Sequence, residues 1–312
     1  MDVSVIILTF NTRAMTAEAV RSVLASDASV RREILVVDNG SADGTAEFFA
    51  REFPEIHFIR SERNLGFARA VNLAARRAAG EFILLLNSDA RVATDSLTLA
   101  RQWLRDHPEC AVAGAQLINA DGSRQNSIAN LPTLATELLN KSLLRRLWPK
   151  KFPGKEQFFP EPIEVETVVG AFMLIRRSVW DALGGLDERF FFFLEETDFC
   201  RQVRAKSFTV MHLPQVRVCH GQGQTAKQVS VGARIEYWRS RYAYFAKNFG
   251  GVTRRALRIG LLLRLFVDWL AALLLTLVTF GTNSRWTSRL KIYSALVAWH
   301  LRGCPATGGL PR

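Results

Sequence analysis

Four short apolar segments, separated by stretches with helical spacing, most strongly limit what the first hundred residues can fold into. The apolar segments are residues 3–8, 34–37, 56–59 and 82–86, and several are rich in Val and Ile. Helical spacing occupies residues 14–24, 45–51 and 67–79. Strands that are apolar throughout and alternate with helices form a parallel sheet covered on both faces. We therefore predict an α/β fold.

Polar residues follow each of these predicted strands. Thr9 and Asn11 follow the first, Asp38 follows the second, residues 60–64 follow the third, and Asn87-Ser88-Asp89 follows the fourth. In parallel sheets, ligands bind beyond the carboxyl ends of the strands. Such residues also end strands because they make turns, but four consecutive polar strand ends favour a binding site.

The chain after residue 100 contains further predicted elements. They are a strand within 110–127 with a turn at Asp121-Gly122, a strand pair around Gly170, a helix over 178–183, and two short strands within 208–218 before His220. An apolar run at 190–194 leads into Glu195, Glu196 and Asp198. Residues 131–159 mix Leu and Trp with Lys and Arg, including Lys150 and Lys155. This segment is either a solvated helix with a loop or a basic amphipathic element on lipid headgroups.

Cysteine usage and the first residues indicate a cytoplasmic protein. The four cysteines show no CxxC spacing, which is typical of reduced thiols and not of a disulfide framework or a zinc site. The start, MDVSVIILTF, has no basic segment and only a short apolar run, as expected of a first strand and not of a signal peptide. At 48% hydrophobic and 22% charged residues, disorder is excluded.

The net charge of +12 is confined to the C-terminal part of the chain. Residues 1–225 hold 27 basic and 27 acidic residues, whereas residues 226–312 hold 14 basic and 2 acidic residues. The basic region is also leucine-rich and lacks a nucleic-acid-binding motif, so a membrane surface is the expected anionic partner and nucleic acid is not.

Two apolar segments lie in this basic region. Residues 259–280 carry only Arg264 and Asp268, four apart, which can pair on one helix face. A membrane span needs about 20 apolar residues, and the uncharged run 269–280 is shorter. We therefore favour a helix that lies in the interface over one that crosses it. The second segment, 286–299, either joins the first segment at the membrane or packs on residues 1–225 or on another subunit. The last of these arrangements would make the protein a homo-oligomer. The expected membrane contact runs through residues 255–302.

Several common active-site motifs are absent from the sequence. There is no GxxxxGK[ST], no GxGxxG after the first strand and no GxSxG, so an NTPase, a nicotinamide enzyme and a Ser-His-Asp hydrolase are unsupported. The remaining candidates are carboxylates. Asp89, at the end of a buried strand, is placed to bind a hard divalent cation, and His220 can complete such a site. Asp198 fits the ordinary role of an acidic residue in the first turn of a helix.

Six ordered motifs give the chain a resemblance to a known family. They are VSVIILTFN, ILVVDNGSADGT, RNLGFARAVNLA, LLLNSDA, the block from GAFMLIRRS to EETDFCRQV, and VCHGQGQT. Over residues 3–225 the chain resembles family 2 glycosyltransferases of the GT-A fold, especially their rhamnosyltransferase-like branch. The resemblance implies a Rossmann-like mixed sheet in a catalytic domain over 1–225, with a nucleotide-binding half over about 1–115 and an acceptor-side half over about 116–225. A helical membrane-associating tail follows over 226–312.

The resemblance assigns roles to individual residues. It implies nucleotide contacts for Thr9, Asn11 and Asp38. A larger set would line the sugar-nucleotide pocket: Asn64, Gly66, Phe67, Asn72, Asn87 and Ser88. Asp89 and His220 would bind Mg²⁺ or Mn²⁺, although Asn87 stands where the family often has the first Asp of a DxD motif. Glu196 would be the general base, and the adjacent Glu195 is the alternative.

These roles imply an inverting transfer of a sugar from a dTDP- or UDP-sugar to a lipid-linked or polysaccharide acceptor. The expected sugar is rhamnose, in bacterial surface-glycan synthesis at the cytoplasmic face of the membrane. One alternative is a polyprenyl-phosphate sugar synthase of the same fold. The other is a non-catalytic membrane-associated binding protein. Donor, acceptor and linkage are not encoded in local patterns, because small differences in pocket shape decide them.

Overall fold

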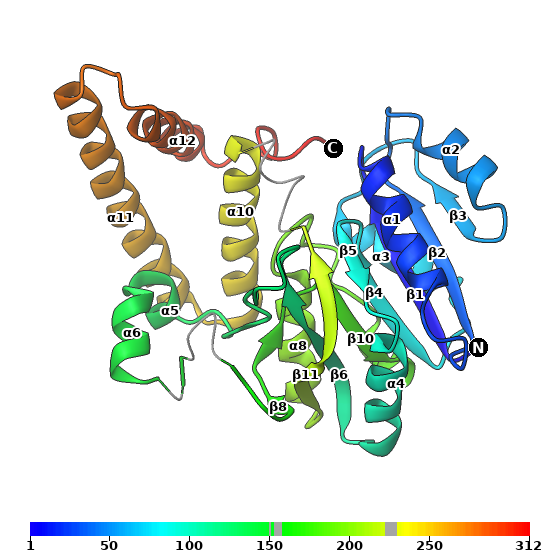
Figure 1. Ribbon diagram of the computed structural model, residues 1–312. Coiled ribbons are helices and arrows are strands. Elements are labelled where there is room, and N and C mark those ends of the chain that lie inside the picture. Colours follow the sequence, from blue (N-terminus) through cyan, green and yellow to red (C-terminus); the bar gives the residue numbers. More distant parts are fainter. Residues whose placement is uncertain (150, 153–157, 222–229) are drawn as a thin grey trace. The chain divides into compact units, whose positions relative to one another are not determined.

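A computed structural model of the chain describes residues 1–149, 151–152, 158–221 and 230–312 (Figure 1). Internal contacts divide the chain into two compact units. Unit 1 contains Met1–Leu131, Phe152–Gln224 and Arg312, and unit 2 contains Pro132–Lys151 and Thr225–Pro311. Lys150, Lys155, the expected boundary at residue 225 and the end of the VCHGQGQT motif lie outside the described residues.

Unit 1 is built on a mixed sheet with the strand order β3-β2-β1-β4-β10-β6-β11-β5. The strands are β1 (Val3–Thr9), β2 (Arg32–Asp38), β3 (His57–Arg60), β4 (Phe82–Asn87), β5 (Ala90–Val92), β6 (Cys110–Ile118), β10 (Phe172–Arg176) and β11 (Thr209–His220). Short strand β8 (Ile163–Glu164) pairs with β11, and β7 (Ile128–Ala129) pairs with β9 (Thr167–Val168). The α/β prediction is confirmed.

The four N-terminal strands are parallel to one another, as their apolar runs predict. Strand β1 lies between β2 and β4, and β2 continues to β3. The register pairs Thr9 with Asp38 and Leu8 with Asn87. Three of the polar strand ends therefore lie side by side at one edge of the sheet.

The other half of the sheet contains antiparallel pairs. Strand β10 runs antiparallel to β4 and β6, and β5 runs antiparallel to β11. The prediction of two short strands within 208–218 is wrong, because β11 is one strand with a register shift between Leu213 and Arg217. Pro214 lies inside that shift, and proline cannot donate a hydrogen bond to the ladder. The strand therefore bulges and continues to His220.

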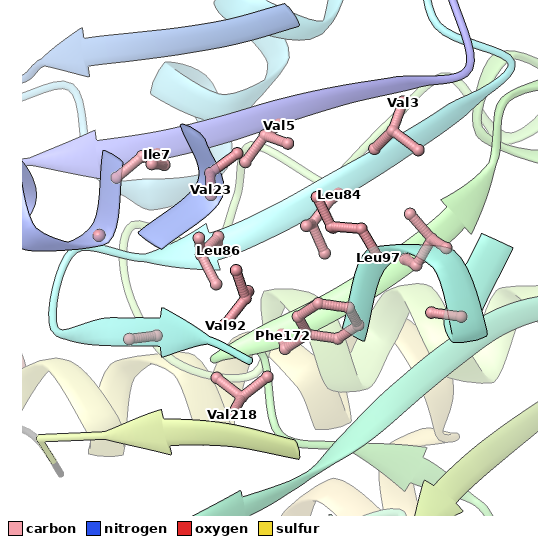
Figure 2. Close-up of a cluster of buried hydrophobic side chains, with 14 of the residues drawn as sticks. Val3, Val5, Ile7, Val23, Leu84, Leu86, Val92, Leu97, Phe172 and Val218 are labelled. Atoms are coloured by element: carbon pink, nitrogen blue, oxygen red, sulfur yellow. The ribbon is translucent and has the colours of Figure 1, made fainter. Parts of the chain in front are cut away.

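Helices cover both faces of the sheet, and each face has its own apolar core. Helices α1 (Arg13–Leu24), α2 (Thr45–Glu52) and α4 (Ser96–Asp106) pack on one face. Helices α3 (Phe67–Ala75), α7 (Arg177–Leu183) and α8 (Glu195–Ala205) pack on the other. Figure 2 shows the first core, where Val5, Leu84 and Phe172 meet. Alternate strand residues enter opposite cores, as the twofold repeat of a strand requires.

Unit 2 consists of helices. They are α5 (Leu134–Leu138), α6 (Lys141–Leu147), α10 (Ser230–Asn248), α11 (Gly251–Val278) and α12 (Ser284–Leu301). Helices α5 and α6 thus belong to the same unit as the C-terminal helices. Gly260 allows α11 to pack closely on α5, because a Cβ at this position would lie 2.7 Å from a methyl carbon of Leu138. Arg241 and Glu137, both buried, form an ion pair at 3.3 Å.

Helix α11 has one buried and one exposed apolar face. Leu257, Leu261 and Leu265 are buried, whereas Leu263, Phe266 and Val267 are each more than half exposed. The helix is long and apolar enough to cross a membrane by length and composition, and 17% of its most apolar window is buried. Arg264 and Asp268 pair at 3.8 Å, as expected from their spacing.

Candidate active site

The carboxylate of Asp38 lies at the C-terminal end of β2 and is completely buried. Its Oδ1 accepts a hydrogen bond from the backbone N–H of Ser41 at 2.9 Å. Its Oδ2 is buried and has no hydrogen-bond partner among the described residues. Because a buried polar atom without a partner is costly, the geometry suits a ligand that donates a hydrogen bond to Oδ2.

Asn11 connects the loops that follow β1 and β2. Its backbone is left-handed, with a φ of 53°. Its Oδ1 accepts from the N–H of Ala42 at 2.8 Å, and its own N–H donates to Ser41 Oγ at 2.9 Å. Asparagine tolerates this backbone conformation better than most residues. Asn11 therefore lies at the same sheet edge as Asp38 and fixes the loop beside it.

Thr9 is fully buried at the end of β1. Its hydroxyl bonds to the hydroxyls of Thr12 at 3.0 Å and Thr16 at 2.9 Å. Its carbonyl accepts from the N–H of Asn39 at 2.9 Å. The structure thus places this hydroxyl against the start of α1, where it shapes the loop that carries Asn11.

Asn39 is a residue whose importance the sequence analysis missed. Its Nδ2 donates to Asn64 Oδ1 at 2.6 Å, and its Oδ1 accepts from the N–H of Leu65 at 2.8 Å. Asn64 Oδ1 also accepts from the N–H of Gly66 at 3.0 Å. Asn39 thereby holds the loop before α3 against the end of β2. Its position directly after Asp38 at a strand end was the signal that could have identified it.

Gly66 lies where α3 meets the segment that precedes Glu195. Its φ is 81°, and a Cβ at this position would lie 2.5 Å from the carbonyl oxygen of Phe191. The N–H of Phe67 donates to that same oxygen at 2.7 Å. The ring of Phe67 meets that of Phe192 edge-on. No side chain larger than hydrogen fits here, so glycine sets the distance between these segments.

Asn72 lies on α3 and holds the segment that follows α7. Its Nδ2 donates to the carbonyl of Leu186 at 2.8 Å and to Glu188 Oε1 at 3.2 Å. Its Oδ1 accepts from the N–H of Leu186 at 2.9 Å. The amide group is therefore used in positioning residues 186–188.

Asp89 and His220 meet although 130 residues separate them in the sequence. His220 Nε2 lies 3.4 Å from Asp89 Oδ1, and both side chains are largely buried. The amide Nδ2 of Asn87 lies 3.5 Å from the same ring nitrogen. The contact arises because β5, directly after Asp89, pairs with the end of β11, so that Ala90 faces His220. Ser88 is half-buried in the turn between β4 and β5.

The chemistry of this cluster fits a divalent cation that also binds a ligand phosphate. A carboxylate and a neutral imidazole are common ligands of Mn²⁺, and a carboxylate with substrate phosphates is the usual environment of Mg²⁺. Among residues 1–149, 151–152, 158–221 and 230–312, no group of three or more His, Cys, Asp or Glu side chains gathers in this way. Asp89 and His220 would thus hold a cation together with groups from a ligand.

Glu195 and Glu196 begin helix α8, directly after two residues with unusual backbone geometry. Phe193 and Leu194 both have a positive φ, at 75° and 68°. Non-glycine residues in this region are strained and cluster at functional sites. Glu195 is buried. Asp198, in the first turn of α8, accepts from Gln202 Nε2 at 2.9 Å.

One oxygen of the Glu196 carboxylate is shut off from solvent, whereas the residue as a whole is half-buried. Its Oε2 is buried and has no hydrogen-bond partner among the described residues. Burial raises the pKa of Glu196 above its ordinary value, because the charged form loses its hydration. Such a carboxylate has a pKa closer to the operating pH of a general base.

A short segment connects Glu196 to the Asp89–His220 cluster. The N–H of Asn87 donates to the carbonyl of Ala171 at 3.1 Å. A Cβ placed on the neighbouring Gly170 would lie 3.4 Å from Glu196 Cγ. Glu196 therefore lies over Gly170, and the end of β4, two residues before Asp89, is bonded to the neighbouring Ala171.

A family model covers more than half of the chain that carries this site. Residues 4–184 match the model described as Glycosyl transferase family 2. The chain belongs to this family. It is therefore a glycosyltransferase, and the resemblance noted in the sequence is confirmed.

Named relatives of this glycosyltransferase are a rhamnosyltransferase and a hexosyltransferase. It is 24% identical over 240 residues to N-acetylglucosaminyl-diphospho-decaprenol L-rhamnosyltransferase of Mycobacterium tuberculosis, covering 72% of this chain and 78% of that protein. It is 25% identical over 256 residues to the low-salt glycan biosynthesis hexosyltransferase Agl10 of Haloferax volcanii, covering 79% and 76%.

Comparison with solved structures establishes the fold. The glycosyltransferase aligns with the mannosyltransferase PcManGT from Pyrobaculum calidifontis, solved with GDP-Man and Mn²⁺, at a TM-score of 0.58 and 17% identity. The alignment covers 98% of this chain and 88% of that chain. The predicted GT-A fold is confirmed.

Proposed function

We propose that this protein is an inverting, metal-dependent rhamnosyltransferase that uses a nucleotide sugar and a lipid-linked acceptor in cell-surface glycan synthesis. The observation that carries the proposal is the meeting of Asp89 with His220 just after β4, at the sheet edge that also holds Asp38. Glu196 lies over Gly170, next to the residue that is bonded to the end of β4. The name of the Mycobacterium tuberculosis relative supports the sugar and the lipid-linked acceptor, and the name of the Haloferax volcanii relative supports glycan synthesis. Mn²⁺ in the structure of the mannosyltransferase supports the metal.

The proposed reaction assigns a task to each part of the site. Asp38 Oδ2 accepts a hydrogen bond from the nucleoside, and Asn11 and Asn64 hold the surrounding loops. Glu196 removes the proton of the acceptor hydroxyl as that oxygen forms a bond to the anomeric carbon. The bond from this carbon to the diphosphate breaks on the opposite side, so the configuration inverts. Asp89 and His220 would hold a divalent cation, which would supply positive charge to the departing diphosphate.

Product analysis tests the proposed function. We expect rhamnose to be transferred from dTDP-rhamnose to diphospho-polyprenol-linked N-acetylglucosamine, with inverted configuration, when Mn²⁺ or Mg²⁺ is present. UDP- and GDP-sugars, and polyprenyl phosphate as acceptor, complete the screen. A sugar phosphate ester as product would contradict the acceptor assignment. A lack of transfer from every nucleotide sugar would contradict the catalytic role.

Unit 2 is the proposed membrane contact. Large apolar side chains are exposed along α11 and also at Leu143, Leu147 and Trp148 of the α6 segment. Exposed apolar residues in this number are unusual for a surface in water. Arg254 and Arg255 lie exposed at the start of α11, where positive charge favours anionic headgroups. A lipid surface at unit 2 would hold the enzyme at the membrane, where a lipid-linked acceptor lies.

Substitution of the exposed α11 face tests the membrane contact. We expect the triple variant Leu263→Ser, Phe266→Ser, Val267→Ser to partition to anionic vesicles at least about tenfold more weakly, because each inserted apolar side chain contributes about 1.5–3 kcal/mol. Vesicle co-sedimentation measures the change. Leu24→Ser, at an exposed leucine of unit 1, is the matched control. Unchanged partitioning of the triple variant would refute the contact.

A further inference from the structure

We propose that Gln125 is a positioning residue that keeps His220 in the tautomer with its proton on Nδ1, so that the lone pair of Nε2 faces Asp89. The tautomer itself is a property of the metal-free protein. Its consequence for metal binding rests on the proposed function of Asp89 and His220.

The side chain of Gln125 is buried and makes three hydrogen-bond contacts. Its Nε2 donates to the backbone carbonyl of His220 at 2.6 Å and to Asn119 Oδ1 at 2.7 Å. Its Oε1 lies 3.0 Å from His220 Nδ1. An amide nitrogen has two protons, and both have acceptors here. The oxygen therefore faces the imidazole, and an amide oxygen can only accept, so Nδ1 must carry a proton.

A chain of hydrogen bonds determines which way the Gln125 amide points. Asn119 Nδ2 donates to Ser123 Oγ at 2.8 Å, and Ser123 Oγ donates to Asp121 Oδ1 at 2.6 Å. Hydrogen bonds from Ser123 lower the pKa of Asp121, so this carboxylate is ionised and can only accept. Ser123 therefore uses its one hydrogen on Asp121 and must accept from Asn119. Asn119 then offers only its oxygen to Gln125.

The backbone around Gln125 is also held in place. The N–H of Gln125 donates to the carbonyl of Leu117 at 2.8 Å, which ties it to the end of β6. Its own carbonyl accepts from Gln116 Nε2 at 3.1 Å. Side chains on such supported backbone keep a defined direction.

The tautomer matters because of what faces the other ring nitrogen. In the neutral imidazole, Nε2 then presents a lone pair to Asp89 Oδ1 at 3.4 Å, with the amide Nδ2 of Asn87 at 3.5 Å as a nearby donor. Two electron-rich atoms at this separation are stabilised by a cation between them. Histidines that bind metals almost always donate their second ring N–H to a fixed acceptor, and losing that acceptor weakens metal affinity about 10–100-fold. Gln125 has the position of such an acceptor.

The tautomer is measured by ¹⁵N NMR of histidine-labelled, full-length, metal-free protein at pH 8, with His220→Gln to assign the signal. We expect a protonated Nδ1 and an unprotonated Nε2. In Gln125→Leu we expect a mixture of tautomers, or a proton on Nε2 that is donated to Asp89. Gln102→Leu, at an exposed glutamine of α4 that bonds to Asp106 within its helix, is the matched control and should match wild type.

A second measurement follows the affinity for Mn²⁺ alone by water-proton relaxation. We expect Gln125→Leu to bind Mn²⁺ about tenfold more weakly or worse, and Gln102→Leu to bind as wild type does. A wild-type His220 protonated on Nε2 would overturn the proposal even if Gln125→Leu does not fold. An unchanged tautomer in a folded Gln125→Leu would do the same. A changed tautomer with unchanged Mn²⁺ affinity would overturn the metal-orienting role. None of these outcomes depends on sugar transfer, so they are distinct from a failure of the proposed function.

Discussion

Glu196→Gln is expected to lower the rate of sugar transfer by about 10²–10⁴-fold while donor affinity stays unchanged. The size of the loss is that of a positioned general base. Glutamine keeps the shape of the side chain over Gly170, but it cannot take a proton from the acceptor hydroxyl. Single-turnover transfer and the dissociation constant of the donor, measured on the same preparation, separate the two effects. Turnover close to wild type would exclude Glu196 as the base.

Glu195→Gln is the comparison that decides between the two adjacent carboxylates. If Glu196 is the base, the Glu195 variant retains most of its turnover. The reverse result would move the role to Glu195. The pH dependence gives an independent reading, because burial raises the pKa of Glu196. The apparent pKa of the acid limb in the pH profile of kcat/KM should therefore lie above the ordinary glutamate pKa of 4.5. Activity should rise with pH as Glu196 ionises.

The same burial predicts that Glu196→Gln stabilises the protein. A glutamate whose pKa is raised by folding binds its proton more tightly in the folded state than in the unfolded state. Above the folded pKa, the ionised carboxylate therefore destabilises the fold, and below the unfolded pKa this cost is absent. The variant should unfold at a higher temperature than wild type near neutral pH. This advantage should disappear as the pH falls through the raised pKa. A higher unfolding temperature would also show that lost activity is not lost folding.

Asp89→Ala is expected to abolish detectable Mn²⁺ binding and to reduce transfer by about 10²–10³-fold. A divalent cation contributes several kcal/mol of charge stabilisation to such reactions, and each 1.36 kcal/mol is a factor of ten in rate. Donor binding should lose its dependence on Mn²⁺, because the ligand that links the cation to the protein is gone. Thermal shift with donor, with and without Mn²⁺, and relaxation titration measure these changes.

Asp95→Ala is the matched control for Asp89, since it removes an exposed carboxylate just before α4. It should bind metal and donor as wild type does. If Asp89→Ala bound both as well as wild type, the ligand role of Asp89 would be wrong. A loss in both variants would instead point to a general effect of lowering the negative charge of unit 1.

The parallel half of the sheet and its polar edge could be predicted from local patterns. Apolar runs identified β1 to β4, and the polar residues shortly after three of these runs identified Asn11, Asp38 and Asp89 as edge residues. These predictions work because the carboxyl ends of neighbouring parallel strands must meet. The same reasoning could not tell how each side chain is used. Thr9 and Asn72 hold neighbouring segments through their hydrogen bonds, and this depends on partners from other elements.

The sequence by itself determined the family, the α/β class and the acidic residues at the sheet edge, because apolar periodicity and strand-end chemistry are encoded within a few residues of each other. Only the tertiary structure decided that Asn87 and Asp89 meet His220, which lies 133 positions after Asn87. It also decided that one carboxylate oxygen of Glu196 is buried and that α5 and α6 belong to the same unit as the C-terminal helices. These features depend on strand pairing, burial and helix packing between distant parts of the chain, which no local pattern specifies.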